Sequence, residues 1–243
     1  MSNGRPRRSP PGRPGKRRPA LLAVLAGVTM LCTAQPAIGA PGALDVGFGT
    51  GGVRSTDFGG TYDWAYAVAV QPDGMIVSAG VSNGAADHDF ALIRHRPDGS
   101  IDPSFGDAGQ VTTDFETSFD WAYAIVLQPD GKIVVGGVTD AAGSRDLALA
   151  RYMPDGSLDP GFGDGGLVIA GLSPLSADTI HALALQPDGK ILAGGTTFPD
   201  ALVLRPNADF IVARFQPDGA TDITFGAGGA MTTDFHQESW DDA

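Results

Sequence analysis

The sequence predicts an all-β protein built from a repeated unit of four short antiparallel strands. The first reason is a constant period, because a Phe-Gly pair returns at intervals of 57, 57 and 63 residues. The second is a Gln-Pro-Asp-Gly sequence that keeps step with this pair. A fixed period of this length indicates a repeat architecture. The Phe-Gly pairs begin at Phe48, Phe105, Phe162 and Phe225, and the turn sequences begin at Gln71, Gln128 and Gln186.

The alternation of side chains in the first unit predicts its strands. Between Trp64 and Val70, bulky residues alternate with alanines, which is the period of two of a β-strand. Pro72-Asp73-Gly74 then predicts a tight turn, because glycine readily takes positive φ. In the second unit we accordingly expect Gly131 at positive φ and Gly143 in a loop that is free to adjust. The other expected strands run from Met75 to Ser82, Asp89 to Arg96 and Gln110 to Phe115.

Four antiparallel strands in each unit, with no helical stretch after the N-terminal segment, are typical of a propeller blade. A parallel β-helix uses far fewer residues in each coil, and a sandwich does not repeat its turns in register. Alternate alanines also suit the narrow, innermost strand of a blade. We expect a propeller-like array that is incomplete, with about three blades and part of a fourth. The repeat domain spans 40–243, with units at 44–100, 101–157, 158–220 and, in part, 221–243.

Three stretches of the sequence together resemble the bacterial delta-60 repeat. They are Leu158 to Gly166 around the Phe-Gly pair, Gln128 to Lys132, and Asp146 to Tyr152. The resemblance extends over residues 44 to 235 and implies a secreted or surface β-propeller, without implying any particular activity. The third unit departs from the pattern. It has Thr179 and His181 in place of Trp and Tyr, lacks the Thr-Asp-Phe strand end, and carries an insertion around Phe198 to Asn207.

The N-terminus has the features of a signal peptide, residues 1–39. A basic segment without acidic residues precedes the apolar run from Ala20 to Leu31, which is shorter than the roughly 20 residues of a membrane span. The small residues of Ala37-Ile38-Gly39 predict cleavage after Gly39. An uncleaved anchor, a lipoprotein site at Cys32 and a twin-arginine route through Arg17-Arg18 are the alternatives. We therefore expect a secreted or cell-surface protein with no membrane span after cleavage.

The charge of the expected mature chain is strongly negative. Seven of the 16 basic residues precede residue 40, so residues 40–243 carry nine basic and 28 acidic residues, a net charge of −19. Such a surface repels nucleic acid and anionic lipid. Solubility outside the cell is the simplest explanation, with an acid-specific binding role as the alternative. Because Cys32 is the single cysteine, the mature chain is expected to have no disulfide and no cysteine-ligated metal.

Two motifs suggest catalytic or metal chemistry, but each has a structural explanation. Gly80 to Gly84 matches the G-x-S-x-G nucleophile elbow, which requires a helix after the serine. A loop and a strand follow instead, and the counterparts of Ser82 are Thr139 and Thr197. Asp87-His88-Asp89 offers metal ligands, but no second histidine recurs at ligand spacing. We expect an inter-strand loop and a solvated loop, respectively.

Calcium is the cofactor that the acidic turns suggest. Asp102, Asp107 and Asp114 recur in part as Asp159 and Asp164, and Gly163 to Gly166 has the composition of a calcium-binding repeat. The nine-residue period of such repeats is missing, and turns themselves require glycine and aspartate. We therefore assign no catalytic, cofactor or metal residues and expect no cofactor, with calcium as the alternative. Three arginines each follow an aspartate by five residues and are expected in structural pairs: Arg94 after Asp89, Arg151 after Asp146, and Arg214 after Asp209.

An aromatic pair in the first strand is the clearest candidate for a binding function. It occurs as Trp64 with Tyr66 and again as Trp121 with Tyr123. Such rings either stack on sugar or pack one blade against the next. The sequence thus predicts an exported, non-enzymatic binding or scaffolding module, whose partner is carbohydrate or protein at the cell surface. The alternative is a propeller-fold hydrolase or lyase acting on polysaccharide.

The count of blades predicts self-association or further repeats. Propellers typically have four to eight blades, whereas three periods lie between Phe48 and Phe225. Bare blade faces expose apolar surface, which costs about 25 cal/mol for each Å². We therefore expect either a longer natural chain or association of copies through these faces.

Overall fold

The computed structural model describes residues 41–84, 87–116, 119–173, 175–199 and 208–234. All of them belong to the compact unit Ile38–Ala243. The expected signal peptide, its cleavage site and most of the expected insertion before Asn207 lie outside the described residues. None of the described residues belongs to a helix with the length and apolar character of a membrane span.

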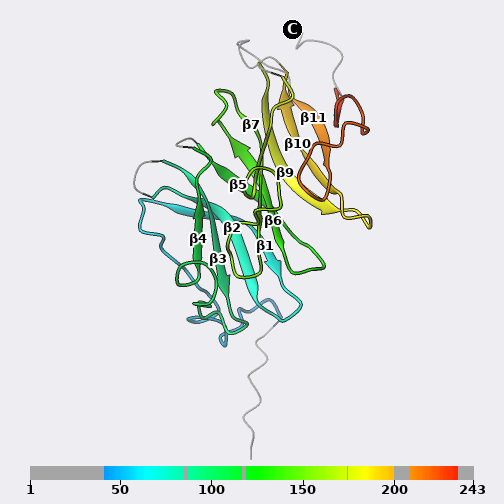
Figure 1. Cartoon of the computed structure of the whole chain (residues 1–243). Coiled ribbons are helices and arrows are strands. Elements are labelled where there is room, and N and C mark those ends of the chain that lie inside the picture. Colours follow the sequence, from blue (N-terminus) through cyan, green and yellow to red (C-terminus); the bar gives the residue numbers. More distant parts are fainter. Residues whose placement is uncertain (1–40, 85–86, 117–118, 174, 200–207, 235–243) are drawn as a thin grey trace, which may run out of the picture. The chain divides into compact units, whose positions relative to one another are not determined.

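The described residues form three four-stranded antiparallel sheets (Figure 1). In sheet 1, each strand pairs with the strand that follows it in the chain, in the order β1-β2-β3-β4. The expected strands of the first unit are confirmed to within two residues at each end. Their bounds are β1 (Asp63–Val70), β2 (Ile76–Ser82), β3 (Asp89–His95) and β4 (Gln110–Thr113).

Sheets 2 and 3 repeat this arrangement, so the predicted all-β fold of four-stranded antiparallel blades is confirmed. Each sheet takes its fourth strand from the beginning of the next sequence unit. Sheet 2 consists of β5 (Trp121–Leu127), β6 (Ile133–Thr139), β7 (Asp146–Tyr152) and β8 (Leu167–Ala170). Sheet 3 consists of β9 (Ala177–Leu185), β10 (Ile191–Phe198), β11 (Asp209–Phe215) and β12 (Ala230–Thr233).

The Gln-Pro-Asp-Gly sequences form the turns between the first and second strands. In sheet 2, the amide of Gly131 donates to the carbonyl of Gln128 at 2.9 Å, and φ of Gly131 is +87°. The expected positive φ is therefore confirmed. Gly143 lies in the loop between β6 and β7, as expected, and its φ of +90° also favours glycine. A side chain at Gly143 nevertheless meets open space, with no other atom within 4 Å of a Cβ built there.

The first strand of every sheet contains a β-bulge, which the sequence pattern does not show. In β1 the register shifts between Ala65 and Ala67, so Tyr66 is the extra residue. The expected unbroken alternation from Trp64 to Val70 is therefore wrong at this point. Tyr123 and His181 are the extra residues of β5 and β9.

Each bulge lies opposite a glycine of the second strand. A Cβ on Gly80 would lie 1.8 Å from the carbonyl oxygen of Trp64, and Gly137 and Gly195 have the same relationship to Trp121 and Thr179. Only glycine therefore permits the close approach of the two backbones, which is a common reason for glycine in a strand. A bulge also redirects side chains, and here it decides how the aromatic residues of the first strands are presented.

Two apolar clusters hold the sheets together. The first joins sheets 1 and 2, where Phe90 and Leu92 of β3 pack with Val135 and Tyr152 of sheet 2. The second joins sheets 2 and 3, where Leu147 and Leu149 of β7 pack with residues that include Ile180 and Ile211 of sheet 3. Alternate residues of sheet 2 therefore face opposite neighbours, and both faces of this sheet are buried.

Candidate functional site

Eight rings from the first strands, the loops before them and the residue before β3 form a continuous cluster, the aromatic strip. Trp64 of β1 lies edge-on to Trp121 of β5, with 5.5 Å between ring centroids. Tyr66 stacks on Trp121 at 5.9 Å and contacts Tyr123 at 5.0 Å. Aromatic pairs with these separations attract one another beyond simple burial. The members of the aromatic strip are Tyr62, Trp64, Tyr66, His88, Phe119, Trp121, Tyr123 and His181.

The aromatic strip reaches solvent as well as joining the sheets. Trp64 is 49% exposed and Tyr66 is 43% exposed, although both contact rings of sheet 2. The indole Nε1 of Trp121 is buried and has no hydrogen-bond partner within the described structure. Buried donors normally have a partner. The predicted packing between blades is therefore present, and about half of the Trp64 and Tyr66 side chains is still accessible to a ligand.

The third unit ends the aromatic strip. Thr179 replaces the tryptophan, and His181 replaces the tyrosine at the bulge. His181 still contacts the ring of Tyr123 at 5.6 Å, and its Nε2 lies 3.2 Å from the hydroxyl of Thr196. Its ring is exposed. The strip therefore extends from sheet 1 to sheet 3, where it ends in the exposed ring of His181.

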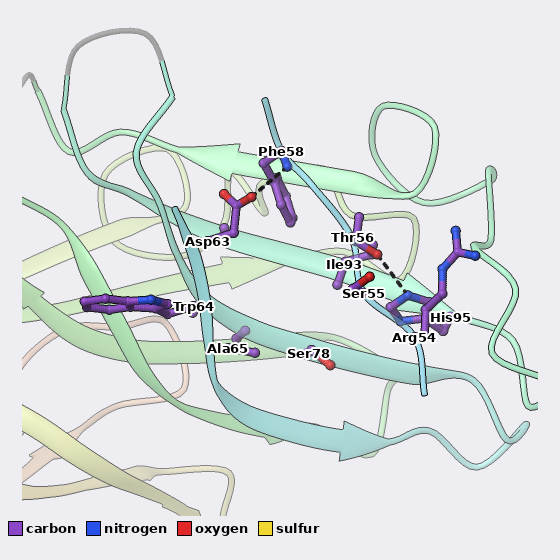
Figure 2. A pocket seen from close by; sticks show the side chains of 13 residues that line it. Arg54, Ser55, Thr56, Phe58, Asp63, Trp64, Ala65, Ser78, Ile93 and His95 are labelled. Carbon is purple, nitrogen blue, oxygen red and sulfur yellow. Dashed lines mark hydrogen bonds between the residues drawn. The ribbon is translucent and has the colours of Figure 1, made fainter. Parts of the chain in front are cut away.

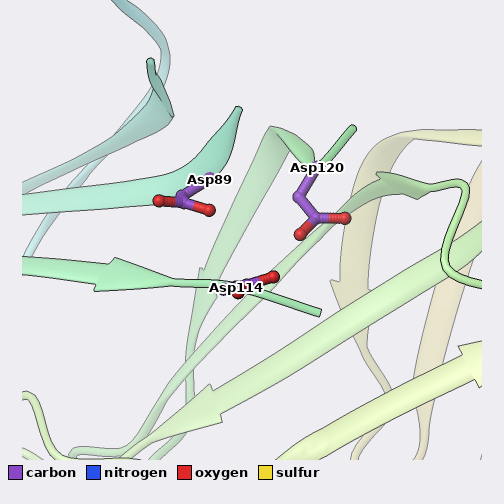
Figure 3. A group of neighbouring side chains, drawn as sticks. All are labelled: Asp89, Asp114 and Asp120. Carbon is purple, nitrogen blue, oxygen red and sulfur yellow. The ribbon is translucent and has the colours of Figure 1, made fainter. Parts of the chain in front are cut away.

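A second candidate site is an acid cluster at the junction of sheets 1 and 2. One carboxylate oxygen from each of Asp89, Asp114 and Asp120 lies within 4.8 Å of the others (Figure 3). Burial, followed by the charges of Asp114, Asp87 and Asp120, raises the pKa of Asp89 to about 6. One oxygen of Asp89 is buried without a hydrogen-bond partner. The cluster can hold a shared proton or a hard cation, since calcium and magnesium prefer such oxygen ligands.

The acid cluster is not repeated at the next junction. Gly171 occupies the place of Asp114, and the corresponding carboxylates there are Asp146 and Asp178. Burial raises the pKa of Asp146, and the charge of Asp178 adds to this effect. Of the aspartates considered for calcium in the sequence, only Asp114 belongs to the cluster. The grouping of Asp89 with Asp120 follows from the packing of two sheets and has no counterpart in sequence spacing.

The aspartates Asp102 and Asp159 form ion pairs with arginines. Arg94 Nε donates to Asp102 at 2.7 Å, and Arg151 Nε donates to Asp159 at the same distance. Their partners are thus eight residues downstream and are not Asp89 and Asp146. Burial opposes ionisation of Asp102, but hydrogen bonds from Ser104 and Arg94 outweigh it and keep its pKa below the usual value. Arg214 and Asp222 repeat the pair in the third unit.

Each of these arginines also lies over the phenylalanine of a Phe-Gly pair. The guanidinium carbon of Arg151 is 4.4 Å from the ring centroid of Phe162, and Arg94 and Arg214 lie similarly over Phe105 and Phe225. Arg94 Nη1 donates to the carbonyl of Pro154 in sheet 2 at 2.5 Å. The arginines therefore link neighbouring sheets, which agrees with the structural pairing expected from their recurrence.

The structure gives no support to a nucleophile elbow at Ser82. Ser82 lies within β2 and is 1% exposed, and its cross-strand neighbours are Asp63 and Asp89. Its counterparts Thr139 and Thr197 are buried in the same way. The sharp strand-to-helix turn that exposes such a nucleophile is missing from this part of the described chain. Gly80 is explained instead by the bulge in β1.

A pocket of about 250 Å³ lies on the face of sheet 1 that is turned away from sheet 2 (Figure 2). Residues 54–58 form one wall, and Ala65, Ser78, Ile93 and His95 line the sheet. Burial, followed by the charge of Arg54, lowers the pKa of His95. The pocket is lined mainly by small side chains, and its polar residues include His95 and Thr56, whose Nε2 and hydroxyl lie 3.5 Å apart.

Comparison with known proteins agrees with the repeats. Residues 71–105, 128–162 and 186–225 each match the family model described as "Domain of unknown function (DUF5122) beta-propeller". Every match runs from the glutamine of a Gln-Pro-Asp-Gly turn to the phenylalanine of the next Phe-Gly pair. These matches support a β-propeller repeat family. No curated protein matches the chain.

Proposed function

We propose that this β-propeller repeat chain, a member of the delta-60 repeat family, is an exported binding module that recognises carbohydrate through its aromatic strip. The observation that carries the proposal is the pair of half-exposed rings, Trp64 and Tyr66, held rigidly against Trp121 and Tyr123. Rigid aromatic side chains offer a large contact area with little loss of conformational entropy.

The chemistry of the strip suits a sugar. Pyranose rings have an apolar face of C–H groups that packs on an aromatic ring, and a rim of hydroxyls that needs hydrogen-bond partners. The Tyr62 hydroxyl and His88 Nε2 form a polar pair beside Trp64. Burial raises the pKa of Tyr66 and of Tyr123, so their hydroxyls stay neutral. Apolar walls with a few polar groups are typical of ligand sites.

The charge and the N-terminal sequence support a function outside the cell. The basic segment, the apolar run and the small residues that end at Gly39 favour export, and a net charge of −19 on residues 40–243 favours neutral partners over phosphate-rich ones. The N-terminal mass of protein recovered from a culture medium tests export. An N-terminus at Ala40, or within two residues of it, is expected, and an intact Met1 or a lipid on Cys32 contradicts it.

Binding is tested by titrating the purified protein with a panel of polysaccharides and following tryptophan fluorescence. Tyr66→Ala is expected to weaken the response to the bound sugar by about tenfold, since one ring contact contributes roughly 1–1.5 kcal/mol. Val70→Ala, on the same strand and 64% exposed, is the matched control and retains full affinity. Equal affinities of both variants and the unchanged protein contradict the assignment of the strip.

A polysaccharide hydrolase is the second candidate, and the acid cluster is the observation that favours it. Glycosidases use two carboxylates, one with a raised pKa, and the pKa of Asp89 is raised to about 6. Asp120, however, is fully buried, and one of its oxygens accepts the amide of Phe115 at 2.7 Å. It is therefore poorly placed to attack a substrate. New reducing ends in the same panel, lost in Asp89→Asn, would establish the hydrolase.

A further inference from the structure

Residues 44–58, here called the N-terminal strand segment, repeat residues 101–115 position by position. Both contain an aspartate at the second position, a Phe-Gly pair, and a Thr-Asp-Phe end. They also dock in the same way. The amide of Gly49 donates to the carbonyl of Asp98 in sheet 1 at 2.8 Å, as Gly106 donates to Asp155 in sheet 2 at 2.7 Å. The N-terminal strand segment is therefore the end of a blade, docked on the next sheet like the others.

In the described structure, none of a blade's first three strands lies beside this segment. Residues 110–113 form β4 because they pair with β3, whereas in the described structure Val53 bridges only to Thr50. Val53 is 54% exposed and Leu44 is 59% exposed. Asp45 corresponds to Asp102, yet no arginine or lysine among the described residues pairs with it. Among the described residues, the segment thus pairs with no strand of a sheet, and the Asp45 carboxylate has no ion-pair partner.

The pocket in Figure 2 is the place where those three strands belong. Ser78, Ala91, Ile93 and His95, four of its lining residues, occupy the positions of Val135, Ala148, Ala150 and Tyr152 in sheet 2. The four residues of sheet 2 are buried against sheet 1 in the first apolar cluster. The hydroxyl of Tyr152 donates to Thr113, and His95 Nε2 lies 3.5 Å from the hydroxyl of Thr56 in the same way. The pocket is therefore an unoccupied blade-to-blade interface.

Sheet 3 carries the complementary surface. Phe210 and Val212 correspond to Phe90 and Leu92, which are fully buried against sheet 2, but they are 63% and 39% exposed. Arg94 donates to the carbonyl of Pro154 in the following sheet, and Arg151 donates to that of Pro217. The described residues offer Arg214 no such carbonyl. The face of sheet 3 therefore matches the face of sheet 1 as one blade matches the next.

We propose that sheet 3 of one copy of this chain packs on sheet 1 of a second copy, with exchange of the fourth strand. In this arrangement the N-terminal strand segment of the second copy pairs with β11 in place of residues 221–234, and Asp45 takes over Arg214 from Asp222. Exchange is required because residues 221–234 of the first copy and the N-terminal strand segment of the second copy would dock on the same site of sheet 1. In the second copy, Gly49 already donates to the Asp98 carbonyl that Gly226 of the first copy would need. The contact is head-to-tail, so repetition generates a ring or a longer array.

The energetic cost of the exchange is small for a physical reason. The strand that leaves, β12, is a four-residue edge strand. The N-terminal strand segment that replaces it has the same Asp, Phe-Gly and Thr-Asp pattern as residues 221–234. Ladder hydrogen bonds and the ion pair are therefore replaced in kind. The gain is the burial of Phe210 and Val212 against the pocket face, which is the usual driving force for association.

Disulfide trapping tests the exchange directly, using residues 40–243 so that Cys32 is absent. The pairing of Phe90 with Thr113 implies that Phe210 lies opposite Thr56 of the second copy. A mixture of the Thr56→Cys and Phe210→Cys proteins is expected to form a disulfide heterodimer under mild oxidation, since directly paired strand residues have the spacing of a disulfide. A mixture of Thr56→Cys with Val68→Cys, whose side chain on β1 is 65% exposed, is the control and forms no disulfide heterodimer.

Light scattering over a concentration series provides the second measurement. The unchanged protein is expected to associate, and Asp45→Asn weakens association by about tenfold or more, as the loss of a charged hydrogen bond implies. Asp73→Asn, an exposed turn aspartate, is the control. A monomer at every concentration overturns the proposal. Association without the Thr56–Phe210 disulfide overturns the strand exchange.

Discussion

One oxygen of Asp120 accepts a hydrogen bond of 2.7 Å from the backbone amide of Phe115 across the junction of sheets 1 and 2. Asp63 and Asp178 accept the amides of Phe58 and Leu172 in the same manner. At each junction, an aspartate at the start of a first strand thus holds the end of the preceding blade. At the junction of sheets 1 and 2, this aspartate is Asp120, which is also a member of the acid cluster.

Replacement of Asp120 by alanine is expected to lower the free energy of unfolding by about 1–3 kcal/mol, because the buried amide of Phe115 loses its acceptor. Urea denaturation measures the loss. Asp107→Ala, at an exposed turn, is the control and changes stability by less than about 0.5 kcal/mol. Asp120→Ala also removes one of the charges that raise the pKa of Asp89. An Asp120→Ala protein as stable as the control would contradict the junction role.

The contribution of Asp89 to the stability of the protein is expected to fall as pH rises from about 4 to about 6. Its pKa is about 6 in the folded state and near 3.8 without the fold, so the folded state binds the proton more tightly. Stability from this group is therefore greatest below pH 4. Asp89→Asn removes this slope and stabilises the protein at pH 7.5. Thermal unfolding at several pH values measures both effects, and parallel curves for the two proteins contradict them.

Removal of calcium by a chelator is expected to leave the melting temperature unchanged. The acid cluster brings together one oxygen from each of three carboxylates, fewer than the six to eight oxygen ligands that calcium takes. Differential scanning calorimetry with and without added calcium measures this. A rise in melting temperature with calcium that disappears in Asp89→Asn would instead identify the cluster as a cation site.

Gly137→Ala is expected to destabilise the protein by roughly 2–4 kcal/mol, since the added Cβ meets the Trp121 carbonyl oxygen at 1.8 Å and displaces the bulge. Gly143→Ala has a strained φ but open space around the Cβ, so it costs about 1–2 kcal/mol. Denaturant titration of both variants gives the comparison. A larger loss at Gly143 would show that φ strain outweighs the clash. Loss of the bulge also moves Tyr123, so the fluorescence of the neighbouring Trp121 is expected to change only in Gly137→Ala.

Arg151→Ala is expected to cost about 3–5 kcal/mol, because it leaves the buried Asp159 without its main partner. Arg96→Ala is the control, since its side chain is 46% exposed and 3.7 Å from Asp102, and such pairs contribute about 0–1 kcal/mol. Lys132 also contacts Asp159 at 3.0 Å and retains part of the charge balance. A loss below 1 kcal/mol for Arg151→Ala would show that the lysine suffices.

Local chemistry allowed much of the fold to be predicted. The strand from Asp89 and the turn at Gly131 follow from the period of two and from the conformational range of glycine, and both are present in the structure. The recurrence of Arg94 and its counterparts indicated structural pairing, and the pairs exist. Their partners were misassigned, because the spacing of five residues along a strand does not bring Asp89 to Arg94. The chain has to turn back through Pro97-Asp98-Gly99 to place Asp102 there.

The repeat, the four-stranded antiparallel unit and the aromatic residues of the first strands could be predicted, because each depends on neighbours along the chain. How these residues meet depends on tertiary packing. The bulge at Tyr66 appears once Gly80 allows the backbone of β1 to approach, and Asp89, Asp114 and Asp120 come together once sheet 2 packs on sheet 1. The docking of the N-terminal strand segment on sheet 1 is likewise a property of packing. Contacts between blades depend on the twist and separation of whole sheets, which no local pattern encodes.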